Sequence, residues 1–260
     1  MKTIAIITGA SSGMGRRFAE TVKKFGTVDE IWAIARRADR LEELKKTAPY
    51  PVRPIALDLS SPEAPGVLQA MLAGETPSVR LLVNASGFGK FQATEETPLA
   101  DNLNMIDLNC RAVAALCQIC LPYMTEGSRI INIASVAAFQ PIPYINVYGA
   151  TKAFVLSFSR ALNREVKPRG IRVMAVCPFW TKTEFFDRAV VTEEAVVKKY
   201  IAMYDPKDIV RRAWRDLKWG KDVSIYGFKA RGQVALVKIL PHKLVMDIWM
   251  KQQGLPQEEK

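Results

Sequence analysis

Short apolar segments alternate with amphipathic helical segments along most of this chain, and this alternation limits the folds that it can adopt. Strands that are separated by helices and buried on both faces are typical of a parallel sheet covered by helices on each side. The apolar segments predict strands over residues 2–8, 30–35, 53–59, 78–85, 128–135, 171–178 and 222–228. The segments between them predict helices over residues 16–26, 38–47, 63–73 and 102–124, and a fifth helix that carries the sequence YGATK and ends near Lys167.

Neither a linker nor an internal repeat interrupts this pattern, so residues 1–260 are predicted to form a single doubly wound α/β domain of the Rossmann type. The apolar content of 49% excludes a disordered chain and suits a large buried core. The N-terminal apolar run is too short for a signal peptide, and no stretch reaches about 18 uninterrupted apolar residues, so no transmembrane segment is expected.

The four cysteines fit a reduced cytoplasmic protein better than a disulfide scaffold. Cys117 and Cys120 have the CxxC spacing, but they lie within an apolar helical segment, which favours core packing. No group of residues has enough ligands for a metal site, so none is predicted.

The formal net charge of +11 raises the question of an anionic partner. Nucleic acid is one candidate, because basic clusters mark nucleic-acid-binding surfaces. Here, however, the Lys and Arg residues are scattered, and neither a nucleic-acid-binding module nor an aromatic–basic stacking pattern is recognisable. We therefore expect no nucleic-acid partner, and an anionic cofactor or acyl carrier explains the charge at least as well.

A glycine-rich turn follows the first predicted strand, with Gly9, Gly13 and Gly15 in a GxxxGxG spacing. Glycines at this point allow a tight turn and let backbone N–H groups approach a pyrophosphate at the start of a helix. The turn is not a Walker P-loop, because Arg16 and Arg17 stand where Lys and Ser/Thr would be. The alternative is an ordinary strand–helix turn without a ligand.

The end of the second strand indicates which dinucleotide is bound. A fold of this class that selects NAD usually has an acidic residue here for the ribose 2′-hydroxyl. This chain instead has Arg36 and Arg37, whose guanidinium groups suit the 2′-phosphate of NADP. NADP(H) is therefore the predicted cofactor.

Tyr148 and Lys152 are four residues apart on a predicted helix, so their side chains share one face. An ammonium about 4 Å from a phenolate attracts it by roughly 4 kcal/mol at an effective dielectric constant near 20. This attraction predicts a lowered pKa for the phenol, which would make Tyr148 a useful general acid. An isolated pair of this kind is more often an ordinary feature of a helix surface.

Several further motifs occur in order along the chain: TGASSGMG at 8–15, Asp58 in LDL, NASG at 84–87, Asn109 in DLNCRA, Ser135 in INIAS, YGATK at 148–152 and PFWTKT at 178–183. Together they resemble the short-chain dehydrogenase/reductase family from Thr3 to about Thr183. The sequence departs from the family's NNAG motif at Ala85 and Ser86, and from its PGxxxT segment at Phe179.

The resemblance implies a seven-stranded parallel sheet and hydride transfer to or from a carbonyl group. It implies that Ser135 hydrogen-bonds the carbonyl oxygen, that Tyr148 donates the proton, and that Asn109 anchors a water molecule of a proton relay. Lys152 is expected to lower the pKa of the phenol and to hold the nicotinamide ribose, and Asp58 to contact the adenine. The expected cofactor-binding residues are Gly9, Ser11, Ser12, Gly13, Met14, Gly15, Arg36, Arg37, Asp58, Leu59, Asn84, Ala85, Ser86, Tyr148, Lys152, Pro178, Thr181 and Thr183.

Aromatic and apolar residues near the expected pocket predict a bulky hydrophobic carbonyl substrate, such as a steroid, an aryl ketone or an acyl ketone. The alternative is that many of them only fill the core. The family places a substrate lid after the sixth strand, at about residues 184–204 here. Residues 229–260 are expected to form a C-terminal extension, whose apolar segment 234–250 completes the lid, covers a partner subunit or lies on a membrane surface. The expected substrate-binding residues are Ser135, Phe139, Tyr144, Trp180 and Phe185.

Three functions fit these features: an NADP(H)-dependent carbonyl reductase or alcohol dehydrogenase, a binding protein that senses NADPH without turnover, and a basic interaction module. The complete Asn–Ser–Tyr–Lys set favours the enzyme, because a sensor has no need of the acid and its relay. The family usually pairs its long fourth and fifth helices, so a homodimer or homotetramer is expected.

Overall fold

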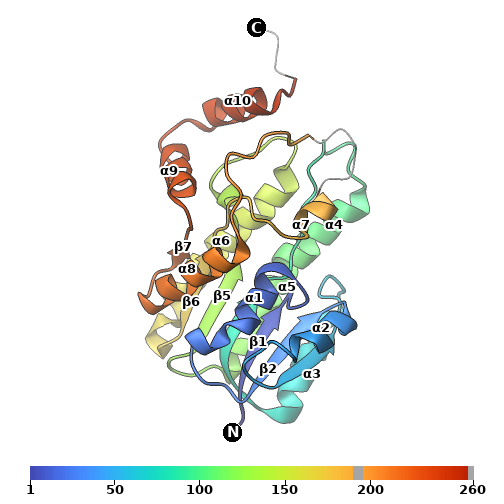
Figure 1. Ribbon diagram of the computed structural model, residues 1–260, viewed down its shortest axis with the longest axis vertical. Coiled ribbons are helices and arrows are strands. Elements are labelled where there is room, and N and C mark those ends of the chain that lie inside the picture. Colours follow the sequence, from blue (N-terminus) through green and yellow to red (C-terminus); the bar gives the residue numbers. More distant parts are fainter. Residues whose placement is uncertain (190–195, 257–260) are drawn as a thin grey trace.

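The computed structural model describes residues 1–189 and 196–256, and within them seven parallel strands form one sheet (Figure 1). The strand order is β3-β2-β1-β4-β5-β6-β7. This arrangement confirms the predicted doubly wound α/β fold with a seven-stranded parallel sheet. The strands are β1 (Thr3–Thr8), β2 (Glu30–Ala35), β3 (Val52–Ala56), β4 (Ser78–Asn84), β5 (Arg129–Ile133), β6 (Arg172–Val176) and β7 (Val223–Ser224).

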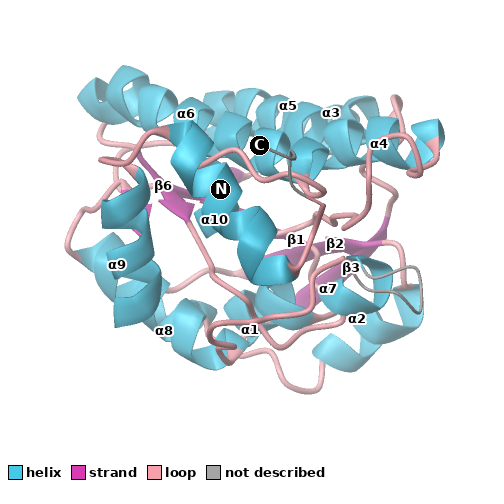
Figure 2. Cartoon of the chain, turned by 90° about the horizontal axis from the view of Figure 1, so that it is seen from above, coloured by secondary structure: helices cyan, strands magenta, loops and turns pink. Residues whose placement is uncertain are grey.

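Helices cover both faces of the sheet, and Figure 2 shows α3, α5 and α6 on one side and α1, α2 and α8 on the other. The α-helices are α1 (Gly13–Glu20), α2 (Ala38–Leu44), α3 (Ala64–Glu75), α4 (Leu99–Ile106), α5 (Ala112–Cys120), α6 (Asn146–Val166), α7 (Phe185–Ala189), α8 (Pro206–Lys218), α9 (Phe228–Val237) and α10 (His242–Gln253).

Strand β1 shows why these apolar segments become central strands. Successive side chains of a strand point to opposite faces of the sheet. Ile4 and Ile6 are fully buried in the core beneath α3, α5 and α6, whereas Ala5 and Ile7 are fully buried in the core beneath α1 and α8. Because both faces are dry, the strand sequence is apolar throughout instead of alternating.

Strand β7 is shorter than the predicted segment 222–228. Gly227 adopts a φ of +92°, which turns the chain into α9 directly after the strand. Only Val223 and Ser224 pair with β6.

The helix predicted over residues 102–124 is built from several pieces. A π-helical turn, Asp107–Arg111, separates α4 from α5, and a 3₁₀ turn, Leu121–Tyr123, follows. By length and composition Leu99–Tyr123 is long and apolar enough to cross a membrane. However, Leu116, Cys117 and Cys120 are buried in the core against the sheet, as in a core helix.

The two C-terminal helices lie beyond the carboxyl ends of the strands, and Figure 1 shows α10 above the rest of the molecule. The Trp249 indole N–H donates a hydrogen bond to the carbonyl oxygen of Pro143 (3.1 Å). The buried Gln253 accepts hydrogen bonds from the backbone N–H groups of Lys198 and Lys199 (2.9 and 3.0 Å). These bonds fix α10 over the edge of the sheet where ligands bind in this class of fold.

Candidate active site

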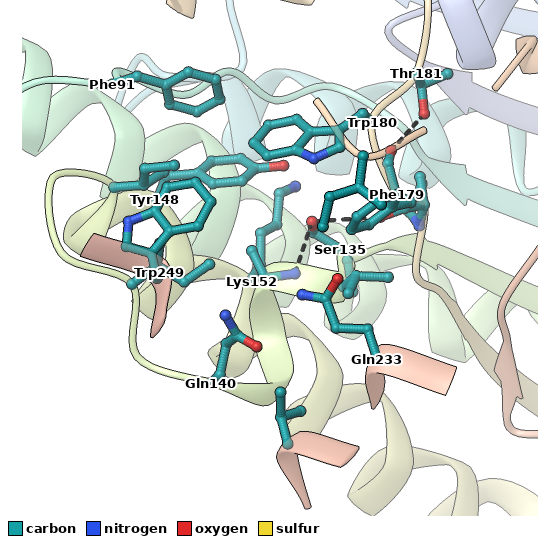
Figure 3. Close-up of a pocket in the computed structure, with 18 of the residues that line it drawn as sticks. Phe91, Ser135, Gln140, Tyr148, Lys152, Phe179, Trp180, Thr181, Gln233 and Trp249 are labelled. Atoms are coloured by element: carbon teal, nitrogen blue, oxygen red, sulfur yellow. Dashed lines mark hydrogen bonds between the residues drawn. The ribbon is translucent and has the colours of Figure 1, made fainter. Parts of the chain in front are cut away.

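Tyr148, Lys152 and Ser135 lie together in the lining of a cavity (Figure 3). Tyr148 and Lys152 come from adjacent turns of α6, and Ser135 follows β5. The Ser135 hydroxyl accepts a hydrogen bond from the backbone N–H of Ala137 (3.1 Å), which fixes it at the start of a 3₁₀ turn. The Lys152 ammonium lies 5.6 Å from the centre of the Tyr148 ring and donates to the carbonyl oxygen of Ile133 (2.9 Å).

Burial dominates the acid–base properties of this pair. It raises the pKa of Tyr148 to about 12, although a hydrogen bond with Ser135 acts in the opposite direction. Burial also lowers the pKa of Lys152 to about 8. The expected net lowering of the phenol pKa is therefore wrong for this structure, because burial outweighs any stabilisation of the phenolate by Lys152. Low-dielectric surroundings disfavour the charged form of both groups, and the ammonium is bound to a backbone carbonyl instead of the phenol.

Asn109 lies in the π-helical turn, is completely buried, and fixes the loop after β4. Its amide nitrogen donates to the carbonyl oxygen of Phe88 (2.9 Å) and to the hydroxyl of Thr151 (3.0 Å), and its oxygen accepts from the backbone N–H of Phe88. A Cβ atom on Gly87 would lie 2.9 Å from the Asn109 oxygen and 3.3 Å from the Lys152 nitrogen. Glycine at this position allows the loop to pass close to both side chains.

The glycine-rich turn lies between β1 and α1, beside the loop that follows β4. Gly9 has a φ of +64°, and a Cβ atom there would lie 2.7 Å from the carbonyl oxygen of Ala85. Thr183, after β6, lies beside Gly13. The turn therefore forms a close-fitting cradle at the switch point between β1 and β4, and its bare backbone fits a pyrophosphate.

An arginine cluster extends this cradle at the end of β2. Arg37 donates hydrogen bonds to the hydroxyls of Ser11 (3.2 Å) and Ser12 (3.0 Å). Arg37 also forms an ion pair with Glu184 (2.8 Å), and Arg40 binds the other oxygen of the same carboxylate. The hydrogen bonds from Arg40 and Arg37 hold the pKa of Glu184 below its ordinary value. The two guanidinium groups thus hold one anionic group beside the glycine-rich turn.

The cavity above Tyr148 has a volume of about 360 Å³, and its lining is mostly apolar and aromatic. Trp180 lies 5.8 Å from Phe91, and Phe185 lies 5.4 Å from Tyr148, between ring centres. Figure 3 shows Gln140 and Gln233 as polar side chains in this lining. Helices α9 and α10 complete the wall with Gln233, Leu236, Val237, Val245, Ile248 and Trp249.

Comparison with known proteins settles the family. The model of the short chain dehydrogenase family matches residues 3–194, which include the cradle, Ser135, Tyr148 and Lys152. This chain belongs to the short-chain dehydrogenase family.

Other members of the family resemble the chain over most of its length. Human very-long-chain 3-oxoacyl-CoA reductase is 32% identical over 191 residues, which cover 69% of this chain and 60% of that protein. Serine 3-dehydrogenase from Rhizobium radiobacter is 34% identical over 187 residues, which cover 71% of this chain and 74% of that protein. A solved short-chain dehydrogenase from Sphingobium yanoikuyae in complex with NADPH is 26% identical, with a TM-score of 0.76, over 100% of this chain and 98% of that chain.

Two expected cofactor-binding side chains of this short-chain dehydrogenase point elsewhere. The buried Asn84 amide donates to the Asn132 oxygen (2.8 Å) and so joins β4 to β5, because an amide inside the sheet must find an internal partner. Leu59 is buried in the core beneath α3. Asp58 is exposed; partial burial acts to raise its pKa, but the hydrogen bonds from Ser60 outweigh this and lower it.

Two of the expected substrate-binding residues do not line the cavity. Phe139 packs between the core beneath α3, α5 and α6 and a small apolar cluster of Val136, Ala230 and Val234, with the Lys238 ammonium 5.3 Å from its ring centre. Tyr144 lies in a turn with a φ of +64°, where its carbonyl oxygen accepts a hydrogen bond from the backbone N–H of Gln92 (2.9 Å). By contrast, Ser135, Trp180 and Phe185 do line it.

Part of the expected lid, residues 190–195, lies outside the described residues. Its described parts contribute to the cavity through Phe185, Phe186, Lys199 and Ile201. The residues that sequence reasoning missed are Arg40, Glu184, Gln140 and Gln233, whereas the apolar segment 234–250 was among the expected lid elements and does line the cavity. Arg40 was visible as a third basic residue after β2, but no local signal indicates that Glu184 lies beside it.

Proposed function

We propose that this short-chain dehydrogenase is an NADP(H)-dependent oxidoreductase that interconverts bulky hydrophobic ketones and secondary alcohols. The observation that carries the proposal is the position of Ser135, Tyr148 and Lys152 together in the wall of a largely apolar cavity. A panel of ketones followed by NADPH oxidation tests it. Binding of NADPH without turnover of any ketone would instead support a sensor.

The proposed mechanism assigns one task to each polar group. NADPH supplies the hydride. Ser135 donates a hydrogen bond to the carbonyl oxygen and stabilises the negative charge that develops there. Tyr148 transfers its proton to this oxygen, and its raised pKa keeps it protonated at neutral pH. Asn109 keeps the loop after β4 against Lys152, which holds the glycine-rich cradle in a fixed position relative to Tyr148.

Lys152 has two proposed tasks. Its ammonium would hold the nicotinamide ribose, and its positive charge would stabilise the phenolate that remains after proton transfer. Its present partner, the carbonyl oxygen of Ile133, holds the ammonium in the wall of the cavity. The proposed catalytic residues are therefore the four expected from the sequence, Asn109, Ser135, Tyr148 and Lys152.

The proposed preference for NADP(H) rests on the arginine cluster. A 2′-phosphate would offer negative charge and hydrogen-bond acceptors to Arg37 and Arg40, as the Glu184 carboxylate does in this structure. Arg36 adds positive charge nearby and acts on the pKa of Asp58. We expect kcat/KM for NADPH to exceed that for NADH by at least about tenfold, and Arg37→Ala to remove most of this difference.

Glu184 should compete with the 2′-phosphate for Arg37 and Arg40. Removal of its charge by Glu184→Gln is therefore expected to tighten NADPH binding by about threefold or more and to leave NADH binding unchanged. Cofactor fluorescence titration measures both constants. Asp187→Asn, a neighbouring exposed acid on α7, serves as the control for a general change of charge. Weaker binding of NADPH in Glu184→Gln would show that Glu184 positions the arginines instead of competing.

The proposed substrate class rests on the apolar lining of the cavity. The two relatives differ widely, since one is named for a very-long-chain acyl substrate and the other for serine. The aromatic walls formed by Phe91, Trp180 and Phe185 favour a bulky apolar substrate over a small polar one. We propose a hydroxysteroid-like or acyl ketone, with weak activity on small hydrophilic sugars.

Trp180→Ala is expected to raise KM for a bulky aryl ketone by about tenfold, because an apolar wall of the cavity is lost. KM for NADPH should change much less. Trp219→Ala, which removes an exposed indole at the end of α8, is the matched control and should change neither. Efficient turnover of a sugar, with none of a steroid or acyl ketone, would refute the substrate class.

We further propose that the enzyme is a homodimer or homotetramer in the cytoplasm. Leu99, Leu103 and Ile106 on α4 and Phe154 on α6 expose apolar surface on the long helices that the family pairs. The four cysteines are free thiols, which fits a reducing compartment.

A further inference from the structure

Exposed apolar side chains surround the mouth of the cavity. Ile201, Leu236 and Ile248 line the cavity and are at the same time 52%, 54% and 41% exposed. Beyond them, Ile239 is 82% exposed and Leu244 is 45% exposed, although neither lines the cavity. Large side chains gathered at one opening are unusual on a free surface and indicate an interaction site.

Helices α9 and α10, together with the connection between them, are strongly basic. Residues 228–253 contain five Lys or Arg residues and a single acidic residue, Asp247. All five basic side chains are exposed: Lys229, Arg231, Lys238, Lys243 and Lys251. A segment that exposes both large apolar side chains and several cations is typical of helices that lie in a membrane interface.

We propose that the face formed by α9 and α10 docks on the surface of an anionic phospholipid bilayer. Ile239 and Leu244 would enter the headgroup region, and the surrounding lysines would contact the lipid phosphates. The docking itself does not depend on the proposed function. Docking would also let a hydrophobic ketone pass from the lipid into the cavity, and this consequence rests on the proposed function.

A second copy of the chain fits this face less well. In a two-fold symmetric dimer the same patch meets itself, so the five cations of one protomer would lie against those of the other. An anionic bilayer carries the complementary charge and also accepts the apolar side chains. The apolar face of α4 and α6 is separate from α9 and α10 and remains free for self-association.

Vesicle sedimentation tests the docking. The wild-type protein should bind vesicles of phosphatidylcholine mixed with phosphatidylglycerol, bind phosphatidylcholine alone much more weakly, and dissociate at high salt. The double variant Ile239→Glu/Leu244→Glu should lower the partition coefficient by at least about tenfold. Val67→Glu is the matched control, because Val67 is 43% exposed on α3, at the opposite end of the molecule (Figure 1), and its binding should equal wild type.

Two further measurements distinguish a lipid bilayer from a second copy of the chain as the partner of this face. Lys243→Gln/Lys251→Gln should weaken binding and reduce its dependence on salt. Sedimentation velocity gives the mass of the wild type and of Ile239→Glu/Leu244→Glu, which should be equal. The proposal would be overturned if the wild type did not bind anionic vesicles. It would also be overturned if the double glutamate variant kept wild-type binding with an unaltered Tm, or if the oligomeric mass of this variant were lower than that of the wild type.

Activity distinguishes docking from the proposed function. With a water-soluble ketone, the double glutamate variant should match the wild type, because neither residue lines the cavity. With a lipophilic ketone embedded in anionic vesicles, it should be slower by about tenfold. Vesicle binding without turnover of either ketone would support docking and refute the proposed function.

Discussion

Replacement of Tyr148 by phenylalanine is expected to lower kcat for ketone reduction by a factor of about 100 or more. The change removes only the hydroxyl, so the ring keeps its contacts with Phe91 and Phe185, at 6.3 and 5.4 Å between ring centres. The affinity for NADPH should therefore stay close to that of the wild type. Steady-state NADPH oxidation and a separate cofactor titration measure the two quantities.

Tyr144→Phe is the matched control for this experiment. It removes the same hydroxyl group from a tyrosine that lies nearby in sequence but does not line the cavity, and kcat should not change. A Tyr148→Phe enzyme that keeps wild-type kcat would show that another group donates the proton.

Lys152→Met is expected to lower kcat by about 100-fold and also to weaken NADPH binding, because the charge has two proposed tasks. The thioether side chain has nearly the same length, so the core around this residue, which is 5% exposed, should stay filled. Lys167→Met, on an exposed lysine just beyond the end of α6, is the control. Normal turnover in Lys152→Met with an unchanged Tm would exclude a catalytic role.

The same pair predicts how the reduction depends on pH. Tyr148 must be protonated to act as the acid, and it stays protonated far above neutral pH because burial raises its pKa to about 12. Lys152 loses its charge as the pH rises through about 8. We therefore expect kcat/KM for reduction to be level at lower pH and to fall above about pH 8. This fall should be absent from the residual activity of Lys152→Met.

The sheet could be predicted because its strands are buried on both faces and are therefore apolar without interruption, as β1 and β2 show. Strand β7 was overestimated, since the apolar segment continues after pairing ends and only the backbone of Gly227 marks the turn. The π-helical turn at Asn109 was not predicted, because the segment around it is apolar on several faces, so an inserted residue leaves no visible break in the pattern.

The glycine-rich turn and the Ser135–Tyr148–Lys152 group could be located because each belongs to a short local motif. The direction of the Tyr148 pKa shift could not, because it depends on burial by residues from several elements. Likewise, the contact of Arg37 with Glu184 joins residues 147 positions apart. The cavity wall on α9 and α10 lies beyond the matched motifs, so the apolar segment 234–250 could be recognised but not what it covers, and Gln233 became visible only in the fold.

The central claim is that this enzyme transfers a hydride from NADPH to a bulky ketone. Transfer of deuterium from labelled cofactor to product tests this claim most directly. The wild-type enzyme would be incubated with a bulky aryl ketone and NADPH that carries deuterium at both C4 positions. Mass spectrometry of the product should then show one deuterium on the carbinol carbon, with one NADPH consumed per alcohol formed. Deuterium retained in the cofactor, with the NADPH bound but the ketone unchanged, would contradict it.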